Sequence, residues 1–230
     1  MQLNNTIMKT YKLNDEINEW DFENGYFLKC NTERIGKFIN HYELYKKIVN
    51  LSGDIAEFGV FKGLSLTRFL SFRNILENET VRRVYGFDVF GKFPTEELNI
   101  EKDVEQAINF ETEAGLGISK EDLNDLLKKK GFSNYDLIEG DINLTLPKFI
   151  EENPFCRFSI IHIDVDVYEP TKLILDNLWD KLNKGGVLIL DDYGTFAGET
   201  RAVDEFFNSK ETILKLPFNY ITRSLTKRQF

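Results

Sequence analysis

The chain has 230 residues, of which 42% are hydrophobic and 29% are charged, and its formal net charge is −9. This composition is typical of a globular protein, and the negative charge argues against a nucleic-acid partner bound through its phosphates. A chain of this length buries a core without disulfide staples, and its two cysteines indicate a reducing, cytoplasmic location. It contains no run of about 18 apolar residues, so we expect no membrane span.

The pattern of apolar residues predicts helices first. They recur at helical spacing over 32–51, which predicts one or two helices and an N-terminal helical cap or lid over residues 1–50. IAEFGVFKG then predicts a strand with a glycine-bearing turn, and LSLTRFLSFRNILEN predicts the helix that follows. Further strands are predicted at RRVYGFDVF, YDLIEGD, RFSIIHID and GGVLILDD, with helices at LPKFIEEN, PTKLILDNLWDKL and ETRAVDEFFNSK and a final pair of strands in the tail.

Strands that alternate with helices predict an α/β fold with a doubly wound, mostly parallel sheet and helices on both faces. We assign residues 51–230 to this domain. The segment 91–133 is too long for one crossover helix and contains the charged helix KEDLNDLLKKKG. We expect an insertion there, which either lines the substrate site or adds a surface helix.

Acidic residues stand at the end of every predicted parallel strand. In open α/β sheets, ligands bind beyond the carboxyl ends of the strands, so a recurring acid at that edge indicates a site. The candidates are Glu57 with Gly59 and Gly63 close behind it, Asp88, Asp141, Asp164, Asp166, Asp191 and Asp192.

The first of these strand ends is suited to a nucleoside. Gly59 and Gly63 allow the backbone to approach a ligand, and Asp88 at the end of the next strand is placed to accept the hydroxyls of a ribose. The pattern G-x-G-x-x-G and the P-loop lysine are both missing, so a pyrophosphate is poorly supported. A ligand with a ribose and no phosphate, S-adenosylmethionine, fits better. The alternative is a tight turn with an incidental aspartate.

The later strand ends are suited to a cation. Asp164 and Asp191 are separated by one helix and one strand, so we expect them on neighbouring strands, with Asp192 adding a further oxygen. A set of carboxylates suits Mg²⁺, Mn²⁺ or Ca²⁺. Without a cation, the acids would raise each other's pKa. The alternative is that they cap helices and stay solvated.

Two residues beside this set are candidates for catalysis. His162 lies on the same strand face as Asp164, where it either touches the site or is a core histidine. Asp166 continues the alternation as a base or as a supporting partner. If the site acts on a substrate hydroxyl, Asp164, Asp166 or His162 is a candidate for the base that takes its proton. His41 is interpreted as a core residue.

The stretches GDIAEFGVFKGLSL, YGFDVFGKFP, IHIDVDVYEPT and GGVLILDDYGTFAGETRAVDEFF resemble the macrocin O-methyltransferase family. The resemblance implies a class I methyltransferase fold with seven strands, the last antiparallel, and transfer of a methyl group from S-adenosylmethionine to a sugar hydroxyl. It also implies Mg²⁺ at Asp164, Asp191 and Asp192 and ribose binding at Asp88. The family tends to have an acid before TLP, where this chain has Leu144, and Asp141 is the nearest acid for the adenine side.

The sequence leaves two other functions open. A metal-dependent glycosyltransferase also places DVD after an apolar strand, although the glycine turn and Asp88 would then have no task. A binding protein on a methyltransferase fold would be expected to lose at least one acid. We expect a small-molecule sugar or nucleotide-sugar as partner, and homo-oligomer formation stays open.

Overall fold

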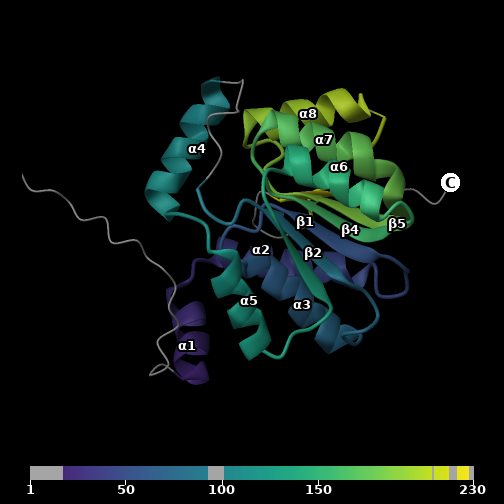
Figure 1. Cartoon of the computed structure of the whole chain (residues 1–230). Coiled ribbons are helices and arrows are strands. Elements are labelled where there is room, and N and C mark those ends of the chain that lie inside the picture. The colour runs from purple at the N-terminus through teal and green to yellow at the C-terminus, as the bar shows by residue number, and fades with distance from the viewer. Residues whose placement is uncertain (1–17, 93–100, 209, 218–221, 228–230) are drawn as a thin grey trace, which may run out of the picture.

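The computed structural model describes residues 18–92, 101–208, 210–217 and 222–227 (Figure 1). The strands are β1 (Asp54–Phe58), β2 (Val84–Asp88), β3 (Tyr135–Glu139), β4 (Phe158–Ile163), β5 (Leu182–Leu190) and β6 (Arg223–Thr226). The helices are α1 (Glu19–Lys29), α2 (Thr32–Lys46), α3 (Leu64–Leu76), α4 (Glu101–Ala114), α5 (Lys120–Lys129), α6 (Ile142–Glu152), α7 (Tyr168–Leu178) and α8 (Ala197–Phe207), and the 3₁₀ turn η2 (Trp179–Lys181) follows α7. Within these ranges, no helix has both the length and the apolar character that crossing a membrane requires.

The six described strands form one sheet in the order β3-β2-β1-β4-β5-β6. Strands β1 to β5 are parallel and β6 is antiparallel to β5, which confirms the predicted α/β class and the antiparallel last strand. The expected count of seven strands is wrong for the described residues. A final pair of strands was predicted in the tail. Among the described residues, the first of the pair forms only an isolated bridge, between Leu214 and Ser224. Pro217 follows it closely and has no N–H to extend the pairing.

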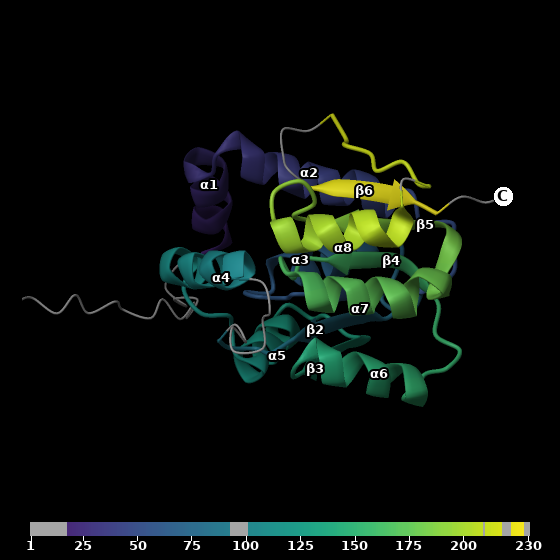
Figure 2. The same ribbon diagram turned by 90° about the horizontal axis from the view of Figure 1, so that it is seen from above.

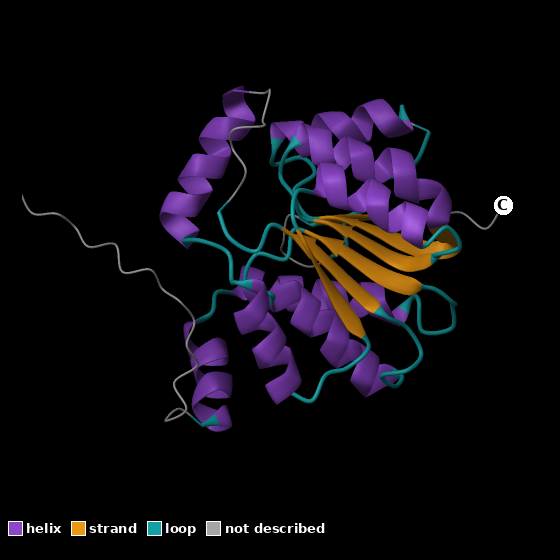
Figure 3. Ribbon diagram, in the orientation of Figure 1, coloured by secondary structure: helices purple, strands orange, loops and turns teal. Residues whose placement is uncertain are grey.

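Helices cover both faces of the sheet (Figures 2 and 3). On one face, strand residues such as Ile55 and Ile160 pack with apolar residues of α2, α3 and α5. On the other face, Phe58 and Ile161 pack with residues of α6, α7 and α8. Successive residues of a strand point to opposite faces, and strands buried on both faces read as continuous apolar runs, which is why the sequence located them.

The predicted insertion contains two helices that differ in how they pack. Leu123 and Leu127 of α5 are fully buried, so α5 belongs to the layer that covers the sheet. The preceding helix, α4, stands near the edge where the parallel strands end (Figure 1). That α4 lines a substrate site stays a prediction. We did not predict α4 itself, although Val104, Ala107 and Ile108 have helical spacing.

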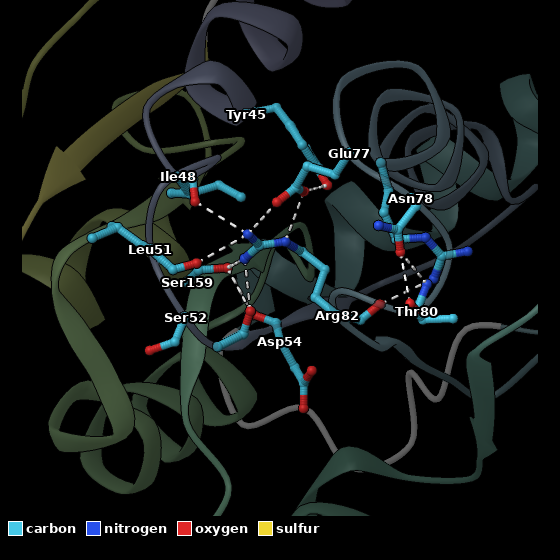
Figure 4. Close-up of polar contacts among 12 residues, drawn as sticks. Tyr45, Ile48, Leu51, Ser52, Asp54, Glu77, Asn78, Thr80, Arg82 and Ser159 are labelled. Carbon is cyan, nitrogen blue, oxygen red and sulfur yellow. Dashed lines mark hydrogen bonds and ion pairs between the residues drawn. The ribbon is translucent and has the colours of Figure 1, made fainter.

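A buried arginine forms a hydrogen-bond network at the amino ends of the strands (Figure 4). Arg82 is 2% exposed, and its Nε and Nη2 atoms donate to the two carboxylate oxygens of Glu77 at 2.9 and 2.6 Å. Its Nη1 donates to the Gly53 carbonyl and to Ser159 Oγ, each at 2.7 Å. The Tyr45 hydroxyl donates to Glu77 at 2.6 Å. One cation and one anion therefore join α2, α3, β1 and β4 at the amino ends of the strands.

Candidate active site

The register of the central strands brings the predicted acids together. Ile163 of β4 lies opposite Leu190 of β5, so Asp164 and Asp191 leave the sheet side by side. The Asp191 N–H donates to the Ile163 carbonyl at 3.0 Å, and the Asp164 N–H donates to the Phe58 carbonyl at 2.8 Å. The predicted adjacency of the two strand ends is confirmed.

The acids do not group as the sequence predicted. Carboxylate oxygens of Asp164, Asp166 and Asp192 lie within 4.8 Å of one another, whereas Asp191 is grouped with His41 and His162. Asp191 and Asp192 are consecutive, but they lie in the bend that follows β5, and their carboxylates belong to different groups. The predicted ligand set Asp164, Asp191 and Asp192 is thus divided between two neighbouring clusters.

The three grouped acids are crowded. Burial and the nearby Asp191 carboxylate raise the pKa of Asp164 to about 7. Burial, followed by repulsion from Asp166 and Asp191, raises the pKa of Asp192 well above its usual range. Asp166 has a φ of 65°, a left-handed conformation that is uncommon outside glycine. A backbone held in this way beside crowded acids is typical of a functional site.

Asp191 is balanced by a cation that the sequence analysis missed. The Lys37 ammonium on α2 forms an ion pair with Asp191 Oδ2 and lies 3.6 Å from Asp164 Oδ2. The Thr222 hydroxyl donates to Asp191 Oδ1 at 2.8 Å. Although burial alone would raise it, Lys37 and His162 hold the pKa of Asp191 well below its usual range.

His162 is a core residue that reaches the edge of the acid cluster. It is fully buried, its Nδ1 is 3.1 Å from Glu57 Oε1, and its Nε2 is 3.9 Å from oxygens of both Asp164 and Asp191. Burial lowers the pKa of His162, but Asp191 and Glu57 outweigh that effect and raise it to about 10. The burial of His162 keeps it away from a substrate, and its Nε2 has no hydrogen-bond partner among the described residues.

His41 packs against this histidine. The two rings meet edge to face with centroids 5.2 Å apart, and His41 is also stacked on Phe69. Burial, together with the charges of His162 and Lys37, lowers the pKa of His41 well below its usual range. The neutral, fully buried ring agrees with the prediction of a core residue.

Glu199 is a second residue that the sequence analysis missed. It is fully buried at the start of α8, where its Oε1 accepts the Asp192 N–H at 3.2 Å and its own N–H donates to the Asp166 carbonyl at 3.3 Å. Burial and the charges of Asp191 and Asp166 raise its pKa well above the usual range. Glu199 therefore joins the two loops that carry Asp166 and Asp192.

The two tyrosines of DVDVY and DDY also anchor these loops to α8. The Tyr168 hydroxyl donates to Glu205 at 2.6 Å, and the Tyr193 hydroxyl donates to Asp204 at 2.7 Å. Neighbouring acids of one helix thus fix the segments that follow β4 and β5. The tyrosines of the motifs have a positioning role that their spacing alone did not reveal.

Asp88 lies at the end of β2 against the loop that follows β1. Its Oδ2 accepts the N–H groups of Val60 and Phe61 at 2.7 and 2.9 Å, and its Oδ1 accepts the Phe90 N–H at 2.6 Å. A carboxylate has about four acceptor positions, so about one stays available to a ligand. Asp88 shapes the loop and retains capacity for a ribose hydroxyl.

Gly59 and Gly63, the two predicted glycines, are closely packed against other parts of the chain. Gly59 has a φ of 88°, and a Cβ there would lie 1.7 Å from the Asp164 carbonyl oxygen. Gly63 has a φ of 78°, and a Cβ there would lie 2.4 Å from Leu123. Their first task is therefore to let β1 approach β4 and α3 approach α5.

The segment after β3 has a structural role at its start. Asp141 is the N-cap of α6, where Oδ1 accepts the Asn143 N–H at 2.9 Å. Leu144 is 73% exposed on α6, and it leaves this position without an acid. A role of Asp141 toward adenine stays a prediction.

The linker between α4 and α5 rests on the loops around Asp88. The Gly117 N–H donates to the Gly91 carbonyl at 3.1 Å, and the Ile118 N–H donates to the Phe61 carbonyl at 2.8 Å. The Lys62 ammonium donates to the Ala114 carbonyl at the end of α4. These contacts tie α4 to the same loops.

The donor set fits a hard divalent cation. All grouped ligand atoms are carboxylate oxygens, which Mg²⁺ and Ca²⁺ prefer. Burial and then the neighbouring carboxylates raise the pKa of Asp164 and of Asp192, and a bound cation would favour their charged forms.

Comparison with known proteins identifies the relatives of this chain. The sequence profile of the macrocin-O-methyltransferase (TylF) family matches residues 32–223. Demethyldecarbamoylnovobiocin O-methyltransferase of Streptomyces niveus is 30% identical over 164 residues, which are 68% of this chain and 59% of the relative. The 8-demethyl-8-(2,3-dimethoxy-alpha-L-rhamnosyl)-tetracenomycin-C 4'-O-methyltransferase of Streptomyces olivaceus is 30% identical over 149 residues, 61% of this chain and 53% of the relative. The chain thus spans little more than half the length of these curated relatives.

A solved structure has the same fold. The calicheamicin methyltransferase CalS11 superposes with a TM-score of 0.76 at 24% identity, over 93% of this chain and 87% of that one. This similarity supports the class I methyltransferase architecture.

Proposed function

The chain belongs to the macrocin O-methyltransferase family, and from this premise we propose that it transfers a methyl group from S-adenosylmethionine to a sugar hydroxyl with the help of Mg²⁺. The observation that carries the proposal is the group of crowded carboxylates at the ends of β4 and β5, beside the loop held by Asp88. One part of the site suits a nucleoside and the other suits a cation.

We assign S-adenosylmethionine to the ends of β1 and β2. Asp88 would accept a ribose hydroxyl with its remaining lone pair, while the backbone turned at Gly59 and Gly63 frames the ligand. Glu57 is fully buried against His162, so we expect it to act through that histidine. Asp141 is assigned to the adenine side.

We assign the cation to Asp164 and Asp192, with Asp191 as the third acid of the predicted set. A bound divalent cation lowers the pKa of a hydroxyl and orients the acceptor, which is the chemistry it would supply. Asp164 and Asp192 are the members common to the predicted set and to the structural group.

Asp166 is our choice for the base. It is half-buried, whereas His162 is fully buried and so is kept from a substrate. In the proposed step, Asp166 takes the proton of the acceptor hydroxyl as the oxygen attacks the methyl carbon, and the bond from that carbon to sulfur breaks. Positioning of the two reactants would supply much of the rate. His162 would then act from the core, with its Nε2 3.9 Å from Asp164.

The acceptor is assigned from the relatives. The name of the Streptomyces olivaceus protein specifies O-methylation of a rhamnosyl derivative. A sugar or a nucleotide-linked sugar is therefore the first acceptor to test.

A methyl-transfer screen tests this function. Purified protein is incubated with S-adenosylmethionine and a panel of nucleotide-sugars, with Mg²⁺ or with EDTA, and methylated products are measured by mass spectrometry. We expect a product with Mg²⁺ only, its loss in Asp166→Asn, and its retention in Asp176→Asn, which changes an exposed acid of α7.

Other outcomes distinguish the alternatives. Transfer of a sugar without transfer of a methyl group would identify a glycosyltransferase, which the family membership disfavours. Tight binding of S-adenosylhomocysteine by calorimetry, without turnover of any acceptor, would favour a binding protein. Full activity in EDTA would refute the role of the metal.

A further inference from the structure

Lys37 lies where two of the candidate metal ligands meet. Its side chain comes from α2, outside the sheet, and only 8% of the residue is exposed. The ammonium forms an ion pair with Asp191 Oδ2 and lies 3.6 Å from Asp164 Oδ2. A positive charge therefore already occupies the space between the ends of β4 and β5.

The packing of α2 fixes this position. One turn after Lys37, Asn40 and His41 are buried, and Leu44 and Tyr45 are fully buried against the sheet layer. Buried lysines are rare unless they are paired, because an unpaired buried charge is costly. Electrostatic attraction therefore holds the Lys37 ammonium and the two aspartates together, because each would be costly to bury without a partner.

While Lys37 is in place, each oxygen of Asp191 already has a partner. One oxygen pairs with the ammonium, and the other accepts the Thr222 hydroxyl at 2.8 Å. Carboxylate oxygens of Asp164, Asp166 and Asp192 lie within 4.8 Å of one another. A dication that bound both this group and the Lys37-paired oxygen of Asp191 would lie close to the ammonium and repel it.

We propose that Lys37 is an internal counter-ion that competes with the divalent cation for Asp191 and Asp164. The inference rests on the metal role proposed above. In the metal-free protein, Lys37 offsets part of the negative charge of the two acids and helps to keep α2 docked. When a dication enters, Asp191 exchanges its ammonium partner for the metal, so metal occupancy and the contact between α2 and the acids oppose each other.

The inference is tested by metal binding rather than by activity. Mn²⁺, whose free aqua ion is visible by EPR, is titrated into the full chain without substrate. We expect Lys37→Met to bind Mn²⁺ about tenfold more tightly than the wild type, because coupling between close buried charges is commonly at least this large. Lys37→Arg, which keeps the charge, should remain within about threefold of the wild type.

A matched control lies on the same helix. Lys46→Met removes an ammonium that pairs with the exposed Glu43, three residues away. It changes the net charge by the same amount as Lys37→Met but lies outside the acid cluster. We expect its Mn²⁺ affinity to equal that of the wild type, which separates a local effect from an effect of net charge.

Melting temperature provides a second readout with a change of sign. In EDTA, Lys37→Met should melt below the wild type, because its acids have lost their counter-ion. In saturating Mn²⁺, the order should reverse, with Lys37→Met melting above the wild type. A variant that is merely misfolded would melt lower under both conditions, and Lys37→Gln provides a smaller change in volume if Lys37→Met does not fold.

The outcomes separate this inference from the proposed function. If the wild type and Lys37→Met bind Mn²⁺ with equal affinity, or if the variant binds more weakly, the competition is refuted while the metal role stands. If neither protein binds Mn²⁺, with or without S-adenosylhomocysteine, both proposals fail. Binding by Lys37→Met alone would support competition in its strongest form.

Discussion

The two ends of the central strands carry buried charge in opposite ways. At the amino ends, the Arg82 guanidinium is matched by Glu77, by backbone carbonyls and by Ser159, and each of its nitrogens donates a hydrogen bond. At the carboxyl ends, several carboxylates lie around Lys37 and His162, and a buried oxygen of Glu199 has no hydrogen-bond partner among the described residues.

This difference distinguishes charge that supports folding from charge that supports binding. A network that satisfies its own donors and acceptors has no need of a ligand, and removal of one member leaves the others buried and unpaired. A cluster with more anions than cations lowers the stability of the empty protein and gains most when a cation arrives. We therefore expect the carboxyl ends of the strands to be the part of the sheet where groups needed for binding lower the stability of the empty protein.

The largest effect should follow from breaking the satisfied end. Arg82→Met leaves Glu77 buried and unpaired, and we expect a loss of about 3–5 kcal/mol in the free energy of unfolding. Urea denaturation measures the loss. The adjacent Arg83 pairs with Asp136 at the surface, so Arg83→Met should cost at most about 1 kcal/mol. Equal losses in both variants would contradict the assignment of the network.

A smaller effect should follow from separating β1 and β4 at the acidic end. Gly59→Ala forces a left-handed residue and a Cβ against the Asp164 carbonyl, which should cost about 3 kcal/mol and displace Asp164. Denaturation and Mn²⁺ titration measure the two consequences. At Gly91, a Cβ would meet nothing within 4 Å, so Gly91→Ala should change neither. Retained stability in Gly59→Ala would show that the loop can relax.

Neutralising a crowded acid should have the opposite sign. Asp192→Asn removes a charge that its neighbours disfavour, so we expect the metal-free protein to become more stable. Methyl transfer should fall more than about 100-fold, because a ligand is lost. Denaturation in EDTA and a turnover assay give the two values. A loss of stability would mean that Asp192 is already compensated in the empty site.

The smallest effect should appear in the pH dependence of metal binding. The pKa of Asp164 is raised to about 7, so a proton competes with the metal below that pH. Mn²⁺ affinity should fall about tenfold for each pH unit below about 7 and level off above it. A flat profile from about pH 5 to about pH 8 would contradict the raised pKa.

Stability without metal should also follow pH. The folded state holds the Asp164 proton that the unfolded chain releases near pH 4, so this group lowers stability as pH rises from about 4 to about 7. The pKa of His162 is raised to about 10, so its stabilising contribution is complete below about pH 6.5 and is lost as pH rises through 10.

The sequence predicted the features that depend on short-range pattern. Apolar runs located the parallel strands, and the spacing of one helix and one strand placed Asp164 beside Asp191. The division of Asp191 from Asp192 depends on the bend that follows β5, which the pattern of apolar residues does not specify.

The residues that were missed depend on tertiary packing. Lys37 lies in a helical run that was interpreted through its apolar neighbours, and nothing local reveals where its ammonium points. Glu199 lies in the first turn of α8. The helix dipole already favours an acid there, so its presence does not indicate a site. Their roles arise from contacts with Asp191 and Asp192 that only the folded chain creates.

The partners of Asp191 also bear on how the protein folds. One comes from Lys37, 154 residues before it, and the other comes from Thr222, 31 residues after it. Neither contact can form from local structure, because each joins segments that are distant in the sequence. The environment of the Asp191 carboxylate therefore reports on the docking of both α2 and β6 onto the sheet.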